Sequence, residues 1–338
     1  MGFGKNPTIF MSYFRELCRF FVALQLLPAL ESGEETLVGG QAVLEGVMMR
    51  SPHAWGIAVR RPSGEMASHS EALERPSERH KWMAWPIIRG IVTLGQAMTL
   101  GFRALKFSAN VVLEEIPQEE GQRKVEISGW MATGQILLSL GFFIGFYKLL
   151  PLLVTTGLQR TFPSLGNRIL FNLVDGAIRI GLFVLLIWIT SLWKDMRRVY
   201  QYHGAEHKTV FAFEAHETMT IENAQKYVTW HPRCGTSFLM TVMLISIVFY
   251  TLVPAQTFLM KFLARLILLP LIAGISYEMI RFAAKHRSSF FSILTWPGLL
   301  LQRITTQPPA DDQVQCAIYA LDKAMELEKQ LGGELVIA

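Results

Sequence analysis

The string YHGAEHK at residues 202–208, followed by HPRC at residues 231–234, gathers side chains that bind metal ions. On a helix, residues three and four apart share a face, so His203, Glu206 and His207 are expected to point the same way. Their order is H-x-x-E-H, as in inverted zinc-peptidase motifs. The second string adds a histidine nitrogen and a cysteine sulfur, and Zn²⁺ accepts both. Together the strings predict a zinc site with these ligands: His203, His207, His231 and Cys234.

The composition around these strings is that of a membrane protein. Of 338 residues, 51% are hydrophobic and only 17% are charged, which is too apolar for an ordinary soluble chain. The net charge is +5, but the basic residues cluster beside apolar runs and form no stripe with interleaved aromatic residues. We therefore expect a lipid bilayer as partner and no nucleic acid. The three cysteines lie far apart, which excludes a dense disulfide framework and suits a reducing compartment.

Four apolar stretches are long enough to cross a bilayer as helices of about 20 residues. They lie near 130–158, 168–193, 237–260 and 263–283. In the second stretch, Asp175 and Arg179 are four apart and are expected to form an ion pair. In the fourth, Glu278 stands three residues before Arg281, so it could pair with that arginine or serve a metal or proton path. The predicted fold class is a mainly α, polytopic membrane bundle.

Basic residues decide the expected orientation in the membrane. They follow the second and fourth stretches: Lys194, Arg197, Arg198, Arg281, Lys285 and Arg287. Cytosolic loops carry an excess of such residues, so both of these exits are expected in the cytosol. The prediction is a multi-pass protein of the cytoplasmic (inner) membrane with both termini and the metal site in the cytosol.

The rest of the chain is divided by its charges, prolines and glycines. Residues 8–30 mix apolar residues with Arg15 and Glu16, which favours an interfacial amphipathic helix over a secretory signal. Pro62 and Gly64 indicate a turn between two short strands. The expected units are an amphipathic helix (1–36), a small cytosolic β-element (37–81), a membrane-associated helix and linker (82–128), spans one and two (129–193), a cytosolic metal-site loop (194–236), spans three and four (237–287), and an interfacial segment broken near Pro297 with a C-terminal amphipathic helix (288–338).

Three strings carry a resemblance to a known family. They are GGQAVLEGVMMR at 39–50, HGAEHK at 203–208 and HPRCGTS at 231–237, and the chain resembles the DUF1385 (YqhQ-like) family over most of its length. The resemblance implies a bacterial polytopic membrane protein and a predicted metal-dependent enzyme, without a defined reaction. The first string is also expected to pack beside the metal cluster, because Gln41, Glu45 and Arg50 could line it from a second element.

The chemistry of such a site depends on how many ligands the metal binds. With an open position, zinc lowers the pKa of bound water to about 7, and Glu206 would act as general base of a zinc-dependent hydrolase. With four protein ligands the zinc is structural, and the protein would be a membrane scaffold or interaction factor. A transporter is a further alternative, although the spans hold few polar residues. Nucleophilic attack by Cys234 with a histidine base also stays open, and the substrate is unspecified.

Overall fold

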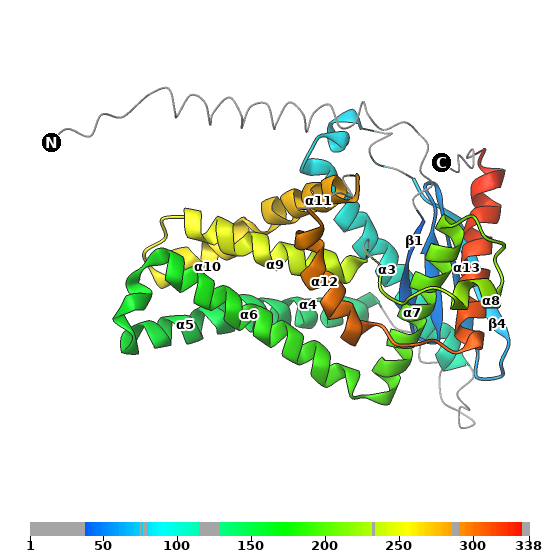
Figure 1. The fold of residues 1–338 in the computed structure, drawn as a ribbon, viewed down its shortest axis with the longest axis horizontal. Helices are drawn as coiled ribbons and strands as arrows, with labels where there is room; N and C mark the ends of the chain where they lie inside the picture. The colour runs from blue at the N-terminus through cyan, green and yellow to red at the C-terminus, as the bar shows by residue number, and fades with distance from the viewer. Residues whose placement is uncertain are drawn as a thin grey trace.

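The computed structural model describes residues 38–74, 76, 80–114, 129–231, 234–285 and 291–332. Within these residues the chain is mainly helical with one small antiparallel sheet, as the sequence predicts. The sheet and the helices packed on it lie at one end, and apolar helices extend from them (Figure 1). The predicted amphipathic helix at 1–36 and most of the linker that ends at 128 lie outside the described residues.

The sheet contains four strands in sequence order, each antiparallel to the next. They are β1 (Gly39–Val43), β2 (Gly46–Arg50), β3 (Ala54–Arg60) and β4 (Met66–Ala72). The tight turn between β1 and β2 places Glu45 at a φ of 50°, and the turn between β3 and β4 places Gly64 at a φ of 91°. The predicted turn around Pro62 and Gly64 and the two short strands on either side of it are confirmed.

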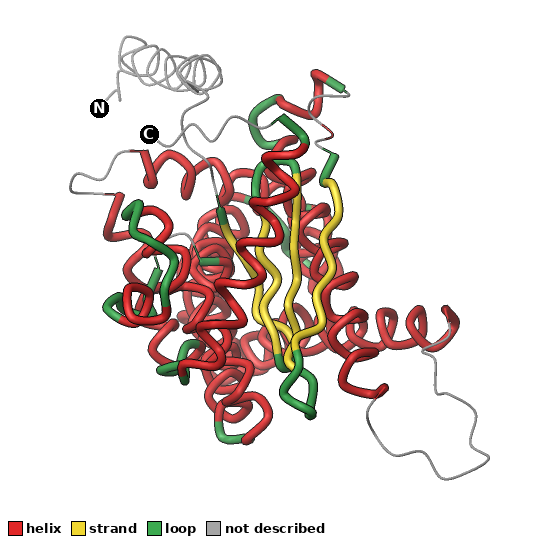
Figure 2. Tube along the Cα trace, turned by 90° about the vertical axis from the view of Figure 1, so that its right-hand side faces the viewer, coloured by secondary structure: helices red, strands yellow, loops and turns green. Residues whose placement is uncertain are grey.

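Helices cover both faces of this sheet (Figure 2). Side chains alternate between the faces of a strand, and on one face Val47, Met49 and Ala58 pack against α7 (Lys194–Glu214) and α13 (Asp311–Gln330). On the other face Met48 and Ile57 pack against α3 (Ile88–Glu114). The C-terminal amphipathic helix expected within 288–338 is α13, which begins at Asp311. The apolar stretch at 82–112 is largely α3, and it packs on the sheet and on a bundle helix.

The bundle contains the predicted apolar stretches. Its helices are α4 (Gly129–Ile144), a π-turn (Gly145–Leu149), α5 (Leu150–Thr161), α6 (Arg168–Ser191), α9 (Gly235–Leu252), α10 (Phe258–Ile267), α11 (Leu269–Lys285) and α12 (Phe291–Thr305). Within the described residues, three helical segments are long and apolar enough to cross a membrane: Leu137–Thr161, Arg168–Ser191 and Gly235–Leu252. The fourth predicted stretch is instead a bent pair, because α10 and α11 meet at 48°. Pro270 lies in the first turn of α11, where its missing N–H costs nothing and a new helix starts easily.

Two further expectations change in detail. The segment 194–236, expected as a loop, consists largely of α7 and the short helix α8 (Ile221–Gln225). In the C-terminal half, α12 runs through Pro297, where the sequence suggested a break. Close packing supports this helix, because a Cβ on Gly298 would lie 2.5 Å from the Cα of Ser237 in α9.

The buried charges of the bundle find partners across helices. The predicted pair of Asp175 and Arg179 forms, and Arg265 of α10 joins it with Nη2 3.0 Å from Asp175 Oδ1. Glu278 of α11 accepts a hydrogen bond from Arg89 Nε of α3 at 2.6 Å. This partner is 189 positions away, so no local spacing rule finds it.

Candidate metal centre

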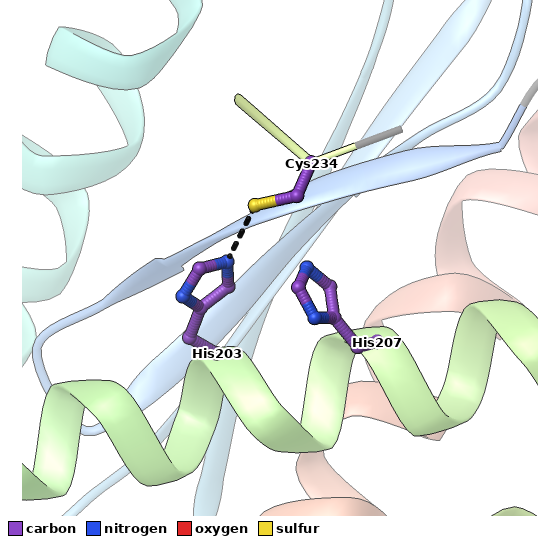
Figure 3. A group of neighbouring side chains, drawn as sticks. All are labelled: His203, His207 and Cys234. Atoms are coloured by element: carbon purple, nitrogen blue, oxygen red, sulfur yellow. Dashed lines mark hydrogen bonds between the residues drawn. The ribbon is translucent and has the colours of Figure 1, made fainter. Parts of the chain in front are cut away.

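Three of the predicted ligands meet at the start of α9. His203 and His207 lie one turn apart on α7, and Cys234 caps the N-terminus of α9 (Figure 3). Their ligand atoms all lie within 4.8 Å of one another, and His203 Nε2 is 3.2 Å from Cys234 Sγ. Among the described residues, no other group of three histidine, cysteine or acidic side chains meets this distance. Two nitrogens and one sulfur therefore converge on one point.

The outer nitrogen of each imidazole is held by a backbone carbonyl. His203 Nδ1 donates to the Thr305 oxygen at 2.8 Å, and His207 Nδ1 donates to the Thr229 oxygen. With the proton on Nδ1, the Nε2 lone pair of each ring faces the cluster, which is the usual orientation of a metal-ligating histidine. Burial lowers the pKa of His207, so the neutral, ligating form is favoured.

Glu206 lies between the two imidazoles on the same helix face. Its Oε2 is 3.5 Å from His207 Nε2 and 4.0 Å from His203 Nε2. Burial raises the pKa of this carboxyl, while His203, His231 and the Gly40 backbone N–H act in the opposite direction. The carboxylate is therefore next to the ligand atoms without belonging to the three-residue group.

His231 lies next to His207 but not among the three converging ligands. Its ring packs edge-on against Phe211 at 4.5 Å between ring centroids and lies 5.6 Å from the ring of His207. Its Nε2 is 3.5 Å from Glu214 Oε1. His231 is thus adjacent to the cluster but outside the three-residue group, and its role as a ligand stays a prediction.

Gln302 of α12 holds the backbone of His231 and was not found by the sequence reading. Its Oε1 accepts from the His231 N–H at 2.7 Å, and its Nε2 donates to the His231 carbonyl at 2.8 Å and to Ser237 Oγ at 3.0 Å. The end of the same helix supplies Thr305, whose carbonyl orients His203. A glutamine inside an apolar stretch is the one signal that the sequence offers for this contact.

The glycine inside the histidine motif has a steric reason. A Cβ on Gly204 would lie 2.2 Å from the Gln307 carbonyl oxygen and 3.2 Å from Thr229 Cγ2. The backbone N–H of Gln307 also donates a hydrogen bond to the Tyr200 carbonyl oxygen of α7, at 2.9 Å. Only a residue without a side chain lets α7 approach so closely. Gly204 thereby allows the segments around Thr229 and Thr305, whose carbonyls orient the two histidines, to pack against α7.

The glycine-rich string reaches the site through Gly40, and not through the polar side chains that were predicted to line it. A Cβ on Gly40 would lie 2.8 Å from Glu206 Cγ. Glu45 instead forms an ion pair with Arg198, and the Tyr202 hydroxyl donates to it at 3.4 Å.

Lys208, the last residue of the histidine motif, donates hydrogen bonds to the Tyr227 and Gln225 carbonyls and so links α7 to the end of α8.

Comparison with known proteins gives a family and one curated relative. The model of DUF1385, described as a protein of unknown function, matches residues 85–327. The "Uncharacterized protein YqhQ" of Bacillus subtilis (strain 168) is 30% identical over 297 residues, covering 86% of this chain and 92% of that protein. No solved structure matches significantly.

Proposed function

The chain belongs to the DUF1385 family of proteins of unknown function, and we propose that it is a membrane-embedded zinc hydrolase with a cytosol-facing site. The observation that carries this proposal is the convergence of three ligand atoms within 4.8 Å, with Glu206 beside them and outside their group. Three protein ligands and a neighbouring carboxylate are the parts of a catalytic zinc site.

The residues fit zinc better than magnesium or calcium. Imidazole nitrogen and thiolate sulfur are ligands that Zn²⁺ prefers, whereas Mg²⁺ and Ca²⁺ take oxygen. His207 Nε2 is buried and has no hydrogen-bond partner among the described residues. The nearby Cys234 thiol is only a weak donor to this nitrogen, and a bound metal would give the nitrogen a stronger partner. His203, His207 and Cys234 are the proposed ligands.

Glu206 is the proposed general base. When bound, zinc supplies a Lewis acid that lowers the pKa of water to about 7. The Glu206 carboxylate, next to both Nε2 atoms, would accept the proton from that water and return it to the leaving group.

A structural zinc site is the second candidate function, and one observation favours it. The three proposed ligands join α7 to the start of α9, and Thr305 links His203 to the end of α12. A metal here would fasten the cytosolic helices to the bundle, as expected of a scaffold or interaction factor. Recruitment of His231 or Glu206 as a fourth ligand would close the shell and exclude catalysis.

Metal content and variants separate these functions. Protein purified in detergent without chelators is expected to hold one zinc ion per chain, measured by mass spectrometry of the metal. His207→Ala should lose it, whereas His80→Ala, a control at an exposed histidine, should keep it. Glu206→Gln should keep zinc and, if the site is catalytic, lose activity against ester, amide or phosphoester test substrates. Near-zero zinc in the wild type would contradict both functions, and a spectroscopic count of four protein ligands would remove the hydrolase.

Embedding in the membrane is supported by the helices and their exposed surfaces. Up to four segments have the length and composition of spans, and large apolar side chains such as Leu185, Trp188 and Val248 are exposed on them. Lipid would cover such surfaces. The basic residues after α6 lie on α7, which is at the sheet end of the bundle (Figure 1). The positive-inside rule then puts the sheet, the metal site and both termini in the cytosol.

Thiol labelling of intact cells tests this orientation. Gly166→Cys, in the connection between α5 and α6, should react with a membrane-impermeant maleimide, because that connection is expected outside the cytosol. Thr218→Cys, in the connection between α7 and α8, should react only after the cells are opened. The reverse pattern would put the site in the other compartment.

A further inference from the structure

A cavity of about 430 Å³ lies at the end of the bundle away from the sheet. It is lined by the connection between α5 and α6, the connection between α9 and α10, and the sides of these helices. Figure 1 shows these connections at the opposite end from α7 and α13. The cavity is therefore separate from the metal centre, and nothing above assigns it a role.

Cationic side chains dominate this cavity. Arg168, Lys261 and Arg265 line it, and no aspartate or glutamate is among the described residues of its wall. Arg179 lies behind Arg265, since both guanidinium groups contact the ring of Tyr250, at 5.2 and 5.4 Å from its centroid. Lys148 Nζ also donates to the Tyr250 hydroxyl at 3.3 Å. Five cationic groups thus lie in the wall of the cavity or next to it.

One carboxylate is shared by the two buried arginines. Asp175 pairs with Arg179 and lies 3.0 Å from Arg265 Nη2, and all three side chains are at most 3% exposed. The Nε atoms of both arginines are buried and have no hydrogen-bond partner among the described residues. A buried charge without compensation is strongly destabilising, and the face of one tyrosine ring compensates it only in part. Two buried guanidinium groups therefore share one carboxylate, which leaves a net positive charge beside the cavity.

We propose that this cavity binds a phosphate group. Guanidinium and ammonium groups together form strong, charge-assisted hydrogen bonds to phosphate oxygens. Arg265 supplies the buried contact, and Lys261 and Arg168 supply contacts closer to the opening, where Arg168 is exposed. The proposal is independent of zinc and of Glu206.

The headgroup of an anionic phospholipid is the favoured source of that phosphate. The segments that carry the basic lining residues also expose large apolar side chains: Phe162 is 55% exposed, Ile169 57% and Leu259 62%. Apolar side chains beside a basic pocket at the end of apolar helices fit a lipid whose chains run along the bundle. Free phosphate would use the same cations without the apolar rim.

Ligand-induced stabilisation of the full-length protein in detergent tests the proposal. The probes are phosphatidylglycerol, phosphatidylcholine, sodium phosphate and sodium acetate, and the readout is the thermal unfolding midpoint as a function of probe concentration. Phosphatidylglycerol is expected to stabilise the wild type. In Lys261→Gln and in Arg168→Gln its apparent affinity should fall about fivefold, the effect of removing one basic residue near an anionic lipid. Lys261→Arg should retain the affinity.

Arg160→Gln is the matched control, because Arg160 is exposed at the end of α5 and does not line the cavity. Unchanged affinity in this variant supports the site. If sodium phosphate stabilises the protein with the same dependence on Lys261 and Arg168, the site takes free phosphate. An equal loss in Arg160→Gln would overturn the proposal, since the attraction would then be diffuse. Equal stabilisation by phosphatidylcholine or acetate, or no stabilisation by any probe, would also overturn it.

Discussion

Gly40 of β1 stands directly against Glu206 of α7. A Cβ on Gly40 would lie 2.8 Å from Glu206 Cγ and 2.5 Å from the Met48 carbonyl oxygen. The Gly40 backbone N–H also donates to the Glu206 carboxylate. The edge strand of the sheet therefore positions the acidic side chain of the candidate metal centre, although the two residues are far apart in the sequence.

Gly40→Ala is expected to lower stability and to displace Glu206. The new methyl group would meet a backbone oxygen that cannot move aside easily, and overpacking of this kind costs about 1–3 kcal/mol. The thermal unfolding midpoint in detergent measures the effect. Gly39→Ala is the matched control, because a Cβ at Gly39 meets no atom within 4 Å. Equal midpoints for the two variants would contradict the contact.

Gly204→Ala should destabilise the protein even though Gly204 lies within a helix. In an open helix, replacement of glycine by alanine gains about 1 kcal/mol. Here the Cβ would lie 2.2 Å from the Gln307 carbonyl oxygen, so α7 must move away from the segment that orients its histidines. We expect a lower unfolding midpoint and weaker zinc retention. Gly181→Ala, in α6 with no atom within 4 Å of the new Cβ, should have an unchanged or higher midpoint.

Gln302→Leu should weaken the cysteine-bearing segment while α12 keeps its length. The change leaves the His231 N–H without its buried acceptor, and an unsatisfied buried group of this kind costs about 1–3 kcal/mol. The His231 carbonyl loses one donor but still accepts from the Cys234 N–H. Hydrogen exchange of the amides around His231, followed by mass spectrometry, should accelerate. Gln302→Glu keeps an acceptor for the N–H but puts a buried carboxylate against the His231 carbonyl, so it should accelerate exchange as well. Unchanged exchange in both variants would contradict this role.

The carboxyl of Glu328 in α13 should make the folded protein less stable at acidic pH. Burial alone would raise its pKa, but hydrogen bonds from Ser51 and His53 outweigh burial and hold the pKa below the ordinary value of 4.5. A carboxyl with a depressed folded-state pKa contributes stability above its unfolded pKa, and this contribution is lost as the pH falls through the folded value. The unfolding midpoint should therefore drop below about pH 4.5.

Two variants check that assignment. Glu328→Gln should have a smaller drop in midpoint between pH 6 and pH 3.5 than the wild type, because it cannot be protonated. Glu326→Gln, at a side chain that is 59% exposed, should follow the wild type. If both variants had the same acid profile, the acid sensitivity would belong to other groups.

Local patterns predicted much of the fold and part of the site. Turn residues placed the hairpins of the sheet, and apolar length placed the helices of the bundle. Helical spacing brought His203, Glu206 and His207 to one face of α7. These features depend on residues a few positions apart, whose geometry follows from the period of the helix or strand. Cys234 was found because its string lies close behind in the sequence.

The sequence by itself therefore determined which side chains could bind a metal, the helix that carries two of them and the apolar character of the bundle. Only the tertiary structure decided the surroundings of these side chains, with Gly40 against Glu206 and Gln302 on His231, and the partner of the buried Glu278, which is Arg89. It also separated His231 from the three converging ligands. Each of these contacts joins two separate elements, and the residues in contact are 71 to 189 positions apart in the sequence. They arise from the packing of whole helices and strands against one another. Local periodicity carries no information about that packing.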